Sequence, residues 1–294
     1  MKVLVTGAAG LLGGRLARLL GASGHEVIAG RHLSPPPAGC PEVPLDLLEE
    51  VSIERALEAA QPGAVLHCAA LADADRCEAE PGLAQRLNTD AAGALARRCR
   101  ALGVRLVAVS TDLVLAGDRP CARETDAAAP RLVYARTKLG GEQAVLGEAP
   151  EAAVVRVALI HGCGHGPRGT ASEAVAWSLA AGARVRLFSD QYRTPVDPES
   201  VAGALLRLLA GAARGVFHVG GPERLSRYDL GVRVARALGL PDTLIEPIRQ
   251  ADQPVGAPRP ADVSLDSSRA RQELGWAPRP LDDAIRQSRR HPGD

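Results

Sequence analysis

A tyrosine and a lysine four residues apart, Tyr134 and Lys138, stand in the helical run "VYARTKLGGE". Residues at this spacing share one face of a helix, so both side chains can point into one cleft. A phenol titrates at about 10, and a neighbouring ammonium group favours the phenolate and lowers that value. The spacing is common in helices, so it indicates acid–base chemistry only in combination with other signals.

A second group of polar residues, Ser110, Thr111 and Asp112, follows the apolar run "RLVAV". Ligands of parallel α/β sheets bind at the carboxyl ends of strands, where this group is expected. A hydroxyl there can hydrogen-bond a substrate carbonyl as charge develops on its oxygen. The alternative is that Ser110 and Thr111 are turn residues and Asp112 caps a helix.

The opening stretch "VTGAAGLLGG" places Gly7, Gly10 and Gly13 between a strand-like run and a helical run. At such a turn, glycine permits a tight backbone path and lets amide groups approach a pyrophosphate, while the helix amino terminus contributes partial positive charge. This context favours a dinucleotide-binding loop over a simple turn.

The residue that follows the second expected strand is informative about the cofactor. An acidic residue there would hold the ribose 2′-hydroxyl of NAD, but the chain reads Gly30, Arg31, His32. A guanidinium binds a 2′-phosphate bidentately, so Arg31 favours NADP(H), with NAD(H) left open. The alternative is that Arg31 is an ordinary surface arginine.

Composition narrows the classes of partner. The 35 Lys and Arg and 34 Asp and Glu leave a net charge of +1, which supports neither nucleic acid nor anionic membrane as a partner. No apolar run reaches the length of about 18 residues that a membrane span needs, and no signal peptide is recognisable. The six cysteines form no CxxC pair. We therefore expect a cytoplasmic protein with reduced thiols.

Three other polar residues, His161, Cys163 and His165, alternate in a glycine-rich loop. They lie near no carboxylate ligand set, so we expect a solvated or substrate-facing loop and no metal. His67, on an apolar run, is interpreted as a core histidine.

Short β-type runs alternate with helical runs through the first half of the chain. This rhythm predicts an α/β fold, a Rossmann-type doubly wound parallel sheet with a smaller C-terminal substrate-binding lobe. We expect the sheet domain to comprise 1–160 and about 196–221, and the lobe to comprise about 161–195 and 222–294. The expected strands are 2–7, 26–30, 64–70, 105–110, 153–160 and 215–221, and the helices include 12–24 and 82–103.

These motifs together resemble a known family. The glycine loop, "HCAA" (67–70), Asn88, "STD" (110–112) and Tyr134-x-x-x-Lys138 are similar to the extended short-chain dehydrogenase/reductases. Within them, "VSTDLVLAG", "VYARTKLGGE" and "RPADVSLDSSRARQELGW" are most similar to dTDP-4-dehydrorhamnose reductases and their sugar-nucleotide-binding relatives. The resemblance covers nearly the whole chain in the same order.

The resemblance implies roles for individual residues. Tyr134 would protonate the keto oxygen, Lys138 would bind the ribose and lower the tyrosine pKa, and Thr111 would orient the substrate. Asn88 would hold the backbone of the active site. The residues expected at the cofactor are Gly7, Gly10, Leu11, Leu12, Gly13, Arg31, Asp46, Leu47, Ala69, Ala70, Leu71, Ser110, Tyr134 and Lys138. The residues expected at the nucleotide sugar are Asp112, Gln191, Arg193 and Arg259.

The sequence also departs from the resembled pattern. Leu113 and Leu115 stand where the typical reductases have an aromatic residue near "STD", and 161–179 lacks the usual Asn-Phe pair.

The expected function is therefore NADPH-dependent reduction of a nucleotide-linked 4-keto sugar. Two alternatives stay open: a nucleotide-sugar epimerase or dehydratase, and a non-catalytic NADP-binding regulatory subunit. A homodimer is also left open.

Overall fold

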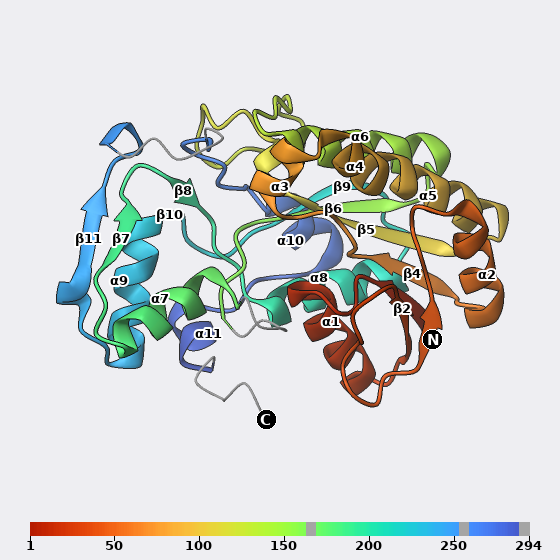
Figure 1. The fold of residues 1–294 in the computed structure, drawn as a ribbon, viewed down its shortest axis with the longest axis horizontal. Coiled ribbons are helices and arrows are strands. Elements are labelled where there is room, and N and C mark those ends of the chain that lie inside the picture. Colours follow the sequence, from red (N-terminus) through yellow and green to blue (C-terminus); the bar gives the residue numbers. More distant parts are fainter. Residues whose placement is uncertain (163–168, 253–258, 288–294) are drawn as a thin grey trace.

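The protein, described here from a computed structural model that covers residues 1–162, 169–252 and 259–287, is built around one large parallel sheet (Figure 1). The strand order is β3-β2-β1-β4-β5-β6-β9, and every neighbouring pair is parallel. The strands are β1 (Lys2–Thr6), β2 (Glu26–Arg31), β3 (Glu42–Pro44), β4 (Ala64–His67), β5 (Arg105–Thr111), β6 (Ala153–Val157) and β9 (Gly215–Val219). The order reverses between β1 and β4, so a ligand crevice is expected at their carboxyl ends.

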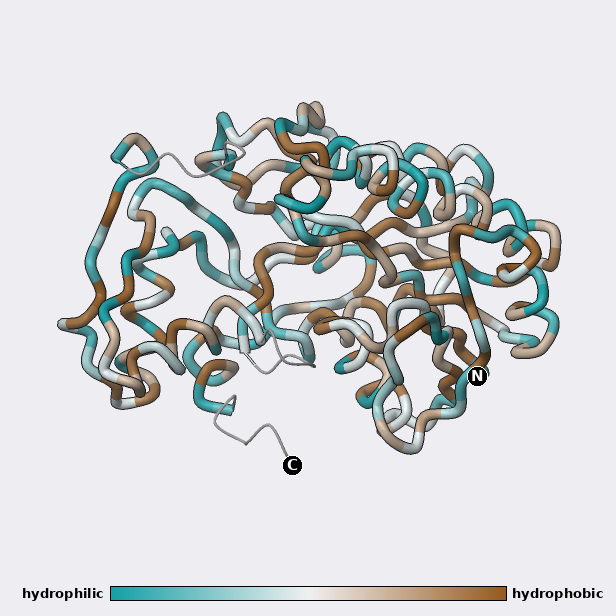
Figure 2. Tube along the Cα trace, viewed as in Figure 1, coloured by the Kyte–Doolittle hydropathy of each residue, from teal (hydrophilic) through white to brown (hydrophobic). Residues whose placement is uncertain are grey.

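Helices cover both faces of this sheet, because parallel neighbours need crossover connections. Leu16, Leu205 and Trp276 belong to the apolar core on one face, whereas Leu57 and Leu95 belong to the core on the other. Figure 2 shows the hydrophobic residues concentrated along the central strands. The helices of the first face are α1 (Leu11–Ala22), α8 (Pro198–Ala210) and α10 (Ser268–Leu274), and those of the second are α2 (Glu50–Ala60), α5 (Ala91–Ala101) and α6 (Val133–Glu148).

The helix expected over 82–103 is interrupted. A short helix, α3 (Ala74–Ala79), precedes α4 (Pro81–Gln85), and a π-helical turn, η1 (Arg86–Asp90), separates α4 from α5. Such a turn inserts extra residues and re-aims side chains, and it is frequent at functional sites. Its one buried residue is Asn88.

The smaller lobe, on the left of Figure 1, carries two short strand pairs. β7 (Val185–Phe188) pairs in parallel with β11 (Ile245–Ile248), and β8 (Tyr192–Arg193) pairs antiparallel with β10 (Leu225–Ser226). Its helices are α7 (Ala171–Ala180), α9 (Arg227–Leu238) and α11 (Leu281–Gln287), and the single turns η3 (Asp242–Leu244) and η4 (Gln250–Asp252) lie in its connections. A third single turn, η2 (Asp112–Val114), directly follows β5 in the large domain. Leu230 and Leu281 join α9 to α11 in a small apolar cluster.

One part of the expected division between the lobes is wrong. Residues 263–276, expected in the smaller lobe, contribute Val263, Leu265 and Trp276 to the core under the large sheet. The indole Nε1 of Trp276 donates to the backbone oxygen of Ser200 on α8 at 2.8 Å. The chain therefore returns to the first domain because these apolar side chains can be buried there.

Within the described ranges, none of the helices is both long and apolar enough to cross a bilayer.

Candidate active site

The glycine turn closes tightly at the carboxyl end of β1. Gly7 has φ +69°, a conformation that side chains disfavour, and a Cβ on it would lie 2.7 Å from the Ala69 nitrogen. A Cβ on Gly13 would lie 2.2 Å from the Gly7 oxygen. Larger residues would therefore force the turn open.

The amino terminus of α1 begins at this turn with free donors. Its N-cap is Gly10, no side chain caps the helix, and no acidic residue occupies the first turn. The first amide groups and the helix dipole thus present positive charge without competition from a side chain. This cradle fits the pyrophosphate of a dinucleotide, to which the backbone N–H groups of Leu11, Leu12 and Gly13 could donate.

The end of β4 is fastened to the end of β1. The Thr6 hydroxyl lies 2.8 Å from Nδ1 of His67 and accepts a hydrogen bond from the Ala69 nitrogen at 3.2 Å. His67 is buried, and burial, followed by the charge of Lys138, lowers its pKa to about 3. His67 is therefore a satisfied, neutral core histidine, which confirms the interpretation from sequence.

Asn88 holds the loop that follows β4. Its Oδ1 accepts from the Leu71 nitrogen at 2.8 Å, and its Nδ2 donates to the Leu71 oxygen at 3.1 Å and to Oγ1 of Thr137 at 3.0 Å. One side chain thus connects the loop 69–71 to α6. The expectation that Asn88 fixes backbone at the site is confirmed by these contacts.

Thr111 and Tyr134 meet at the carboxyl edge of the sheet. Thr111 ends β5, and Tyr134 is the second residue of α6. Burial raises the pKa of Tyr134, the nearby Asp112 carboxylate raises it further, and a hydrogen bond with the Thr111 side chain acts in the opposite direction. The phenol therefore remains protonated at neutral pH.

Lys138 is buried behind Tyr134 on the same helix face. Its Nζ donates to the Val109 oxygen at 2.9 Å. Burial lowers its pKa to about 8, and the Glu142 carboxylate opposes that shift. The expected lowering of the tyrosine pKa by Lys138 is not found, because burial and Asp112 dominate at the phenol.

Asp112 is a buried carboxylate at the same edge, and its environment is unusual. Its Oδ1 accepts from the Thr111 hydroxyl at 3.1 Å, whereas its Oδ2 is buried without a hydrogen-bond partner among the described residues. Burial raises its pKa to about 6, and the charge of Arg193 lowers it. An orphaned buried oxygen here indicates a place where a ligand hydroxyl can donate.

Three arginines gather opposite Asp112 from the smaller lobe. Arg193 on β8 donates to the backbone oxygens of Tyr192 and Pro260, and its pKa is lowered by burial. Arg227, at the start of α9, has its pKa lowered to about 10 by burial and then by Arg193 and, less strongly, Arg259. The like charges are thus close enough to repel. This arrangement suits a polyanionic ligand.

Sequence reasoning named Arg193 and Arg259 but missed Arg227. The available signal was the capping sequence "SRYD", in which Ser226 and Asp229 cap α9 and so place Arg227 in its first turn. Gln191, the other expected residue, is buried, and its Nε2 has no hydrogen-bond partner among the described residues.

At the carboxyl end of β2, Arg31 already has an anionic neighbour. Its Nε lies 2.8 Å from Oε1 of Glu42 on β3, and both side chains are part-exposed. Asp46, which follows β3, accepts from the Leu48 nitrogen at 2.9 Å, and Leu47 lies beside it. A 2′-phosphate on the ribose must therefore compete with Glu42 for Arg31.

No group of three or more possible metal-ligating side chains occurs in the described part of the chain. Cys163 and His165 lie outside the described residues, and the described His161 is buried, with its pKa lowered to about 4 by burial.

A doubly wound sheet with a glycine turn at β1 and a threonine, tyrosine and lysine at its carboxyl edge defines an extended short-chain dehydrogenase/reductase, a class of NAD(P)-dependent oxidoreductases. More narrowly, the chain belongs to the RmlD substrate binding domain family, whose model matches residues 1–291.

Curated relatives of several kinds are similar to the chain. It is 35% identical to a probable low-salt glycan biosynthesis reductase, Agl14, of Haloferax volcanii, with 97% of this chain and 96% of that protein covered. It is 35% identical to dTDP-4-dehydrorhamnose reductase of Mycobacterium tuberculosis, covering 90% and 85%. It is also 33% identical to methionine adenosyltransferase 2 subunit beta of Pongo abelii, covering 91% and 81%.

Solved structures give the same fold. A dTDP-4-dehydrorhamnose reductase of Clostridium acetobutylicum superposes with a TM-score of 0.87 at 26% identity, covering 98% of each chain. MoeE5 in complex with UDP-glucose and NAD superposes with a TM-score of 0.81 at 26% identity, covering 97% of this chain and 96% of that one.

Proposed function

We propose that the protein is an NADPH-dependent reductase of a nucleotide-linked 4-keto sugar, similar to dTDP-4-dehydrorhamnose reductase. The observation that carries the proposal is the convergence of Thr111 and Tyr134, with Lys138 behind them, at the edge where the glycine turn opens. Reductases among the relatives support the same reaction class.

The chain's own residues supply positioning and a proton. Tyr134, kept protonated by burial and by Asp112, donates its proton to the keto oxygen. The Thr111 hydroxyl orients that oxygen as charge develops on it. Lys138 binds the ribose through its ammonium group, and its buried position on α6 keeps it one helical turn from Tyr134.

Backbone groups of the glycine turn and of α1 would hold the pyrophosphate of the cofactor, and the loop from Ala69 to Leu71 would contact its nicotinamide ribose. Asp46 and Leu47 would contact the adenine, and Ser110 would support the cofactor side of β5. The bound nicotinamide supplies the hydride. Arg31 supports a preference for NADPH over NADH, in competition with Glu42.

The substrate lies between the sheet edge and the smaller lobe. Arg193, Arg227 and Arg259 neutralise the diphosphate, which explains why like charges are held together there. Asp112 and Gln191 present buried polar atoms without partners, which suit hydroxyl groups of the sugar. UDP-glucose in the complex of MoeE5 supports a nucleotide sugar as the class of ligand.

The direct test is to mix the protein with NADPH and a panel of dTDP- and UDP-linked 4-keto sugars and to follow the nicotinamide absorbance. We expect consumption of NADPH equal to the sugar reduced. Tyr134→Phe should lower the rate by roughly 10²- to 10⁴-fold, the range typical of a lost general acid, while NADPH still binds. Tyr228→Phe, on α9, is the matched control and should keep the wild-type rate.

A second candidate is a non-catalytic regulatory subunit, favoured by the similarity to methionine adenosyltransferase 2 subunit beta. Tight NADPH binding without consumption of any sugar in the panel would favour it. Sugar turnover without net change in the cofactor would instead favour an epimerase.

A further inference from the structure

A buried ion pair between Glu142 and Arg156 lies one helical turn along α6 from the lysine of the site. Glu142 follows Lys138 by one helical turn on α6, and Arg156 faces it from β6. Arg156 donates to both carboxylate oxygens of Glu142, from Nε at 3.0 and 3.1 Å and from Nη2 at 2.8 Å. Both residues are only 5% exposed. Such a pair is costly to bury and adds little stability over an apolar pair, so its presence calls for a reason beyond stability.

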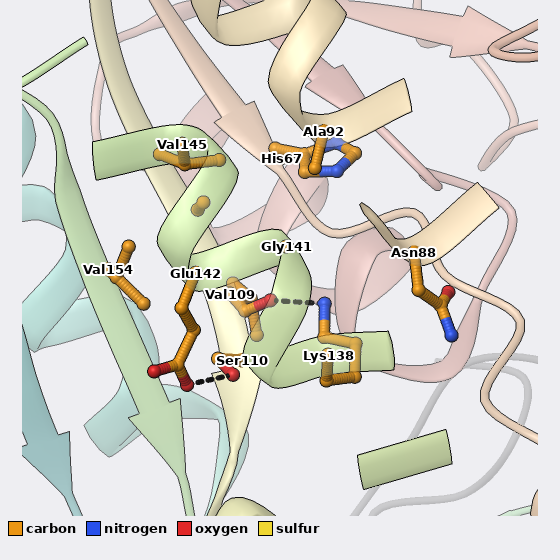
Figure 3. A pocket seen from close by; sticks show the side chains of 11 residues that line it. His67, Asn88, Ala92, Val109, Ser110, Lys138, Gly141, Glu142, Val145 and Val154 are labelled. Carbon is orange, nitrogen blue, oxygen red and sulfur yellow. Dashed lines mark hydrogen bonds between the residues drawn. The ribbon is translucent and has the colours of Figure 1, made fainter. Parts of the chain in front are cut away.

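Helix α6 is fastened to two consecutive residues of β5 through this region. Lys138 donates to the Val109 oxygen, and the Ser110 hydroxyl donates to Oε1 of Glu142 at 2.5 Å (Figure 3). Thr111 is the next residue of the strand. Lys138 and Glu142, four residues apart on α6, thus bind two neighbouring residues of β5. These two contacts hold the helix at a fixed distance from the next residue of the strand, Thr111.

The guanidinium nitrogen of Arg156 that does not bind Glu142 also has a hydrogen-bond partner. Nη1 of Arg156 lies 3.3 Å from Nε2 of His218, whose Nδ1 lies 3.0 Å from the Ala122 oxygen. These distances fit one tautomer, in which Nδ1–H donates to the carbonyl and Nε2 accepts from the guanidinium. Burial and then Arg156 lower the pKa of His218 to about 4, so the ring is neutral. Glu142 is therefore the charged partner of Arg156 in this cluster, and His218 is a neutral one.

We propose that Glu142 is a positioning residue, which keeps Lys138 charged at the cofactor ribose and holds Ser110, and with it Thr111, at the distance that the reaction requires. This inference rests on the proposed function, because it assigns Lys138 to the cofactor. Arg156 holds the carboxylate in place through the buried ion pair.

The charge of Lys138 depends on few neighbours. Burial acts against it, and Glu142 is the largest favourable influence. His67 is neutral, and burial raises the pKa of the Cys68 thiol to about 12, so neither carries charge at neutral pH. Among the described residues, the titratable groups that interact with Lys138 are Glu142 on α6, Cys68 directly after β4, and His67 at the end of β4, whose pKa the lysine lowers.

The test is the dissociation constant of NADPH, measured by fluorescence across neutral and alkaline pH for the wild type, Glu142→Gln and Glu142→Asp. Wild-type affinity should fall as pH rises through the pKa of Lys138, about 8. Glu142→Gln removes a favourable charge, so its midpoint should lie roughly one pH unit lower. Glu142→Asp keeps the charge, so its midpoint should match the wild type, but its shorter reach should weaken affinity severalfold.

A folded Glu142→Gln protein with the wild-type pH profile would overturn the inference while the proposed function stands. If Glu142→Gln does not fold, Glu142→Asp decides, because unchanged affinity in that variant equally contradicts a positioning role. If the wild type itself does not bind NADPH, the proposed function fails, and the inference fails with it.

Discussion

Asn88 holds Leu71 by both of its backbone polar groups, accepting from the nitrogen at 2.8 Å and donating to the oxygen at 3.1 Å. The π-helical turn aims the side chain at this loop, and the remaining donor of the amide binds Thr137 on α6. An amide alone offers an acceptor and two donors in this arrangement. The loop beside the glycine turn is therefore set from a helix that is distant in sequence.

Replacement of Asn88 by aspartate should expose this dependence. A carboxylate still accepts from the Leu71 nitrogen, but it cannot donate to the Leu71 oxygen or to Thr137. We expect a loss of about 1–3 kcal/mol in the free energy of unfolding, measured by urea titration, together with weaker NADPH binding. Gln85→Ala, at an exposed position one turn earlier, is the control. Equal stability of Asn88→Asp and the wild type would contradict the assigned contacts.

Asp112 should make the protein less stable as pH rises through mildly acidic values. Its pKa is about 6 in the folded protein and 3.8 in the unfolded reference, so the folded state binds more protons between these values. Stability therefore falls over this window and reaches a plateau above it. Asp112→Asn should remove the effect, and its advantage over the wild type should grow by up to about 3 kcal/mol between acid and neutral pH.

The measurement for Asp112 is chemical denaturation at a series of pH values. Asp118→Asn, at an exposed position on the following loop, is the control and should follow the wild-type curve. A constant difference between Asp112→Asn and the wild type across the series would show that the carboxyl is not perturbed.

Arg193 should act on the sugar nucleotide and not on the cofactor. Arg193→Met should raise the KM for the nucleotide sugar by at least about tenfold, the cost of one charge-assisted hydrogen bond, and leave the KM for NADPH unchanged. Steady-state kinetics with each substrate varied in turn would measure this. Arg186→Met, at an exposed position on β7, is the matched control. An equal rise in KM for both substrates would show that Arg193 supports the folded structure and does not bind the nucleotide sugar.

Arg31 and Glu42 should have opposite effects on cofactor choice. Arg31→Ala should weaken the binding of NADPH roughly tenfold and that of NADH little, because a contact between the guanidinium and the 2′-phosphate is lost. Glu42→Gln should strengthen NADPH binding, because it frees Arg31 from the ion pair. Both effects are measurable by calorimetric titration of the two cofactors. Equal affinity of the wild type for NADPH and NADH would remove the argument.

Much of the fold followed from local patterns, since alternating apolar strands and amphipathic helices are encoded over short distances. β3 was missed because it has only three residues, two of them exposed. The π-helical turn was missed because propensity continues unbroken from Gly82 to Gly103. The return of 263–276 to the large domain was missed because a Trp at the end of a Pro-rich segment says nothing about which core receives it.

The site shows the same division. Gly7 was identified from its three-residue spacing to Gly10, which a dinucleotide-binding turn requires. Tyr134 and Lys138 were identified from their four-residue spacing, which puts both side chains on one face of a helix. Arg227 and Glu142 were not, because an arginine after a cap and a glutamate in a helix have no distinctive local pattern. Arg193, whose charge acts on Arg227, and Arg156, which forms the ion pair with Glu142, lie on other elements.

The sequence by itself determined the alternation of strands and helices in the first half of the chain, the glycine turn and the residue types available for proton transfer, because each depends on neighbours within about one turn. Only the tertiary structure decided which charges meet. Burial raised the pKa of Asp112 and lowered that of Lys138, and packing brought the Glu142 carboxylate to the Ser110 hydroxyl, next to Thr111. Desolvation and Coulomb interactions depend on distance in space, and residues far apart in the chain supply both.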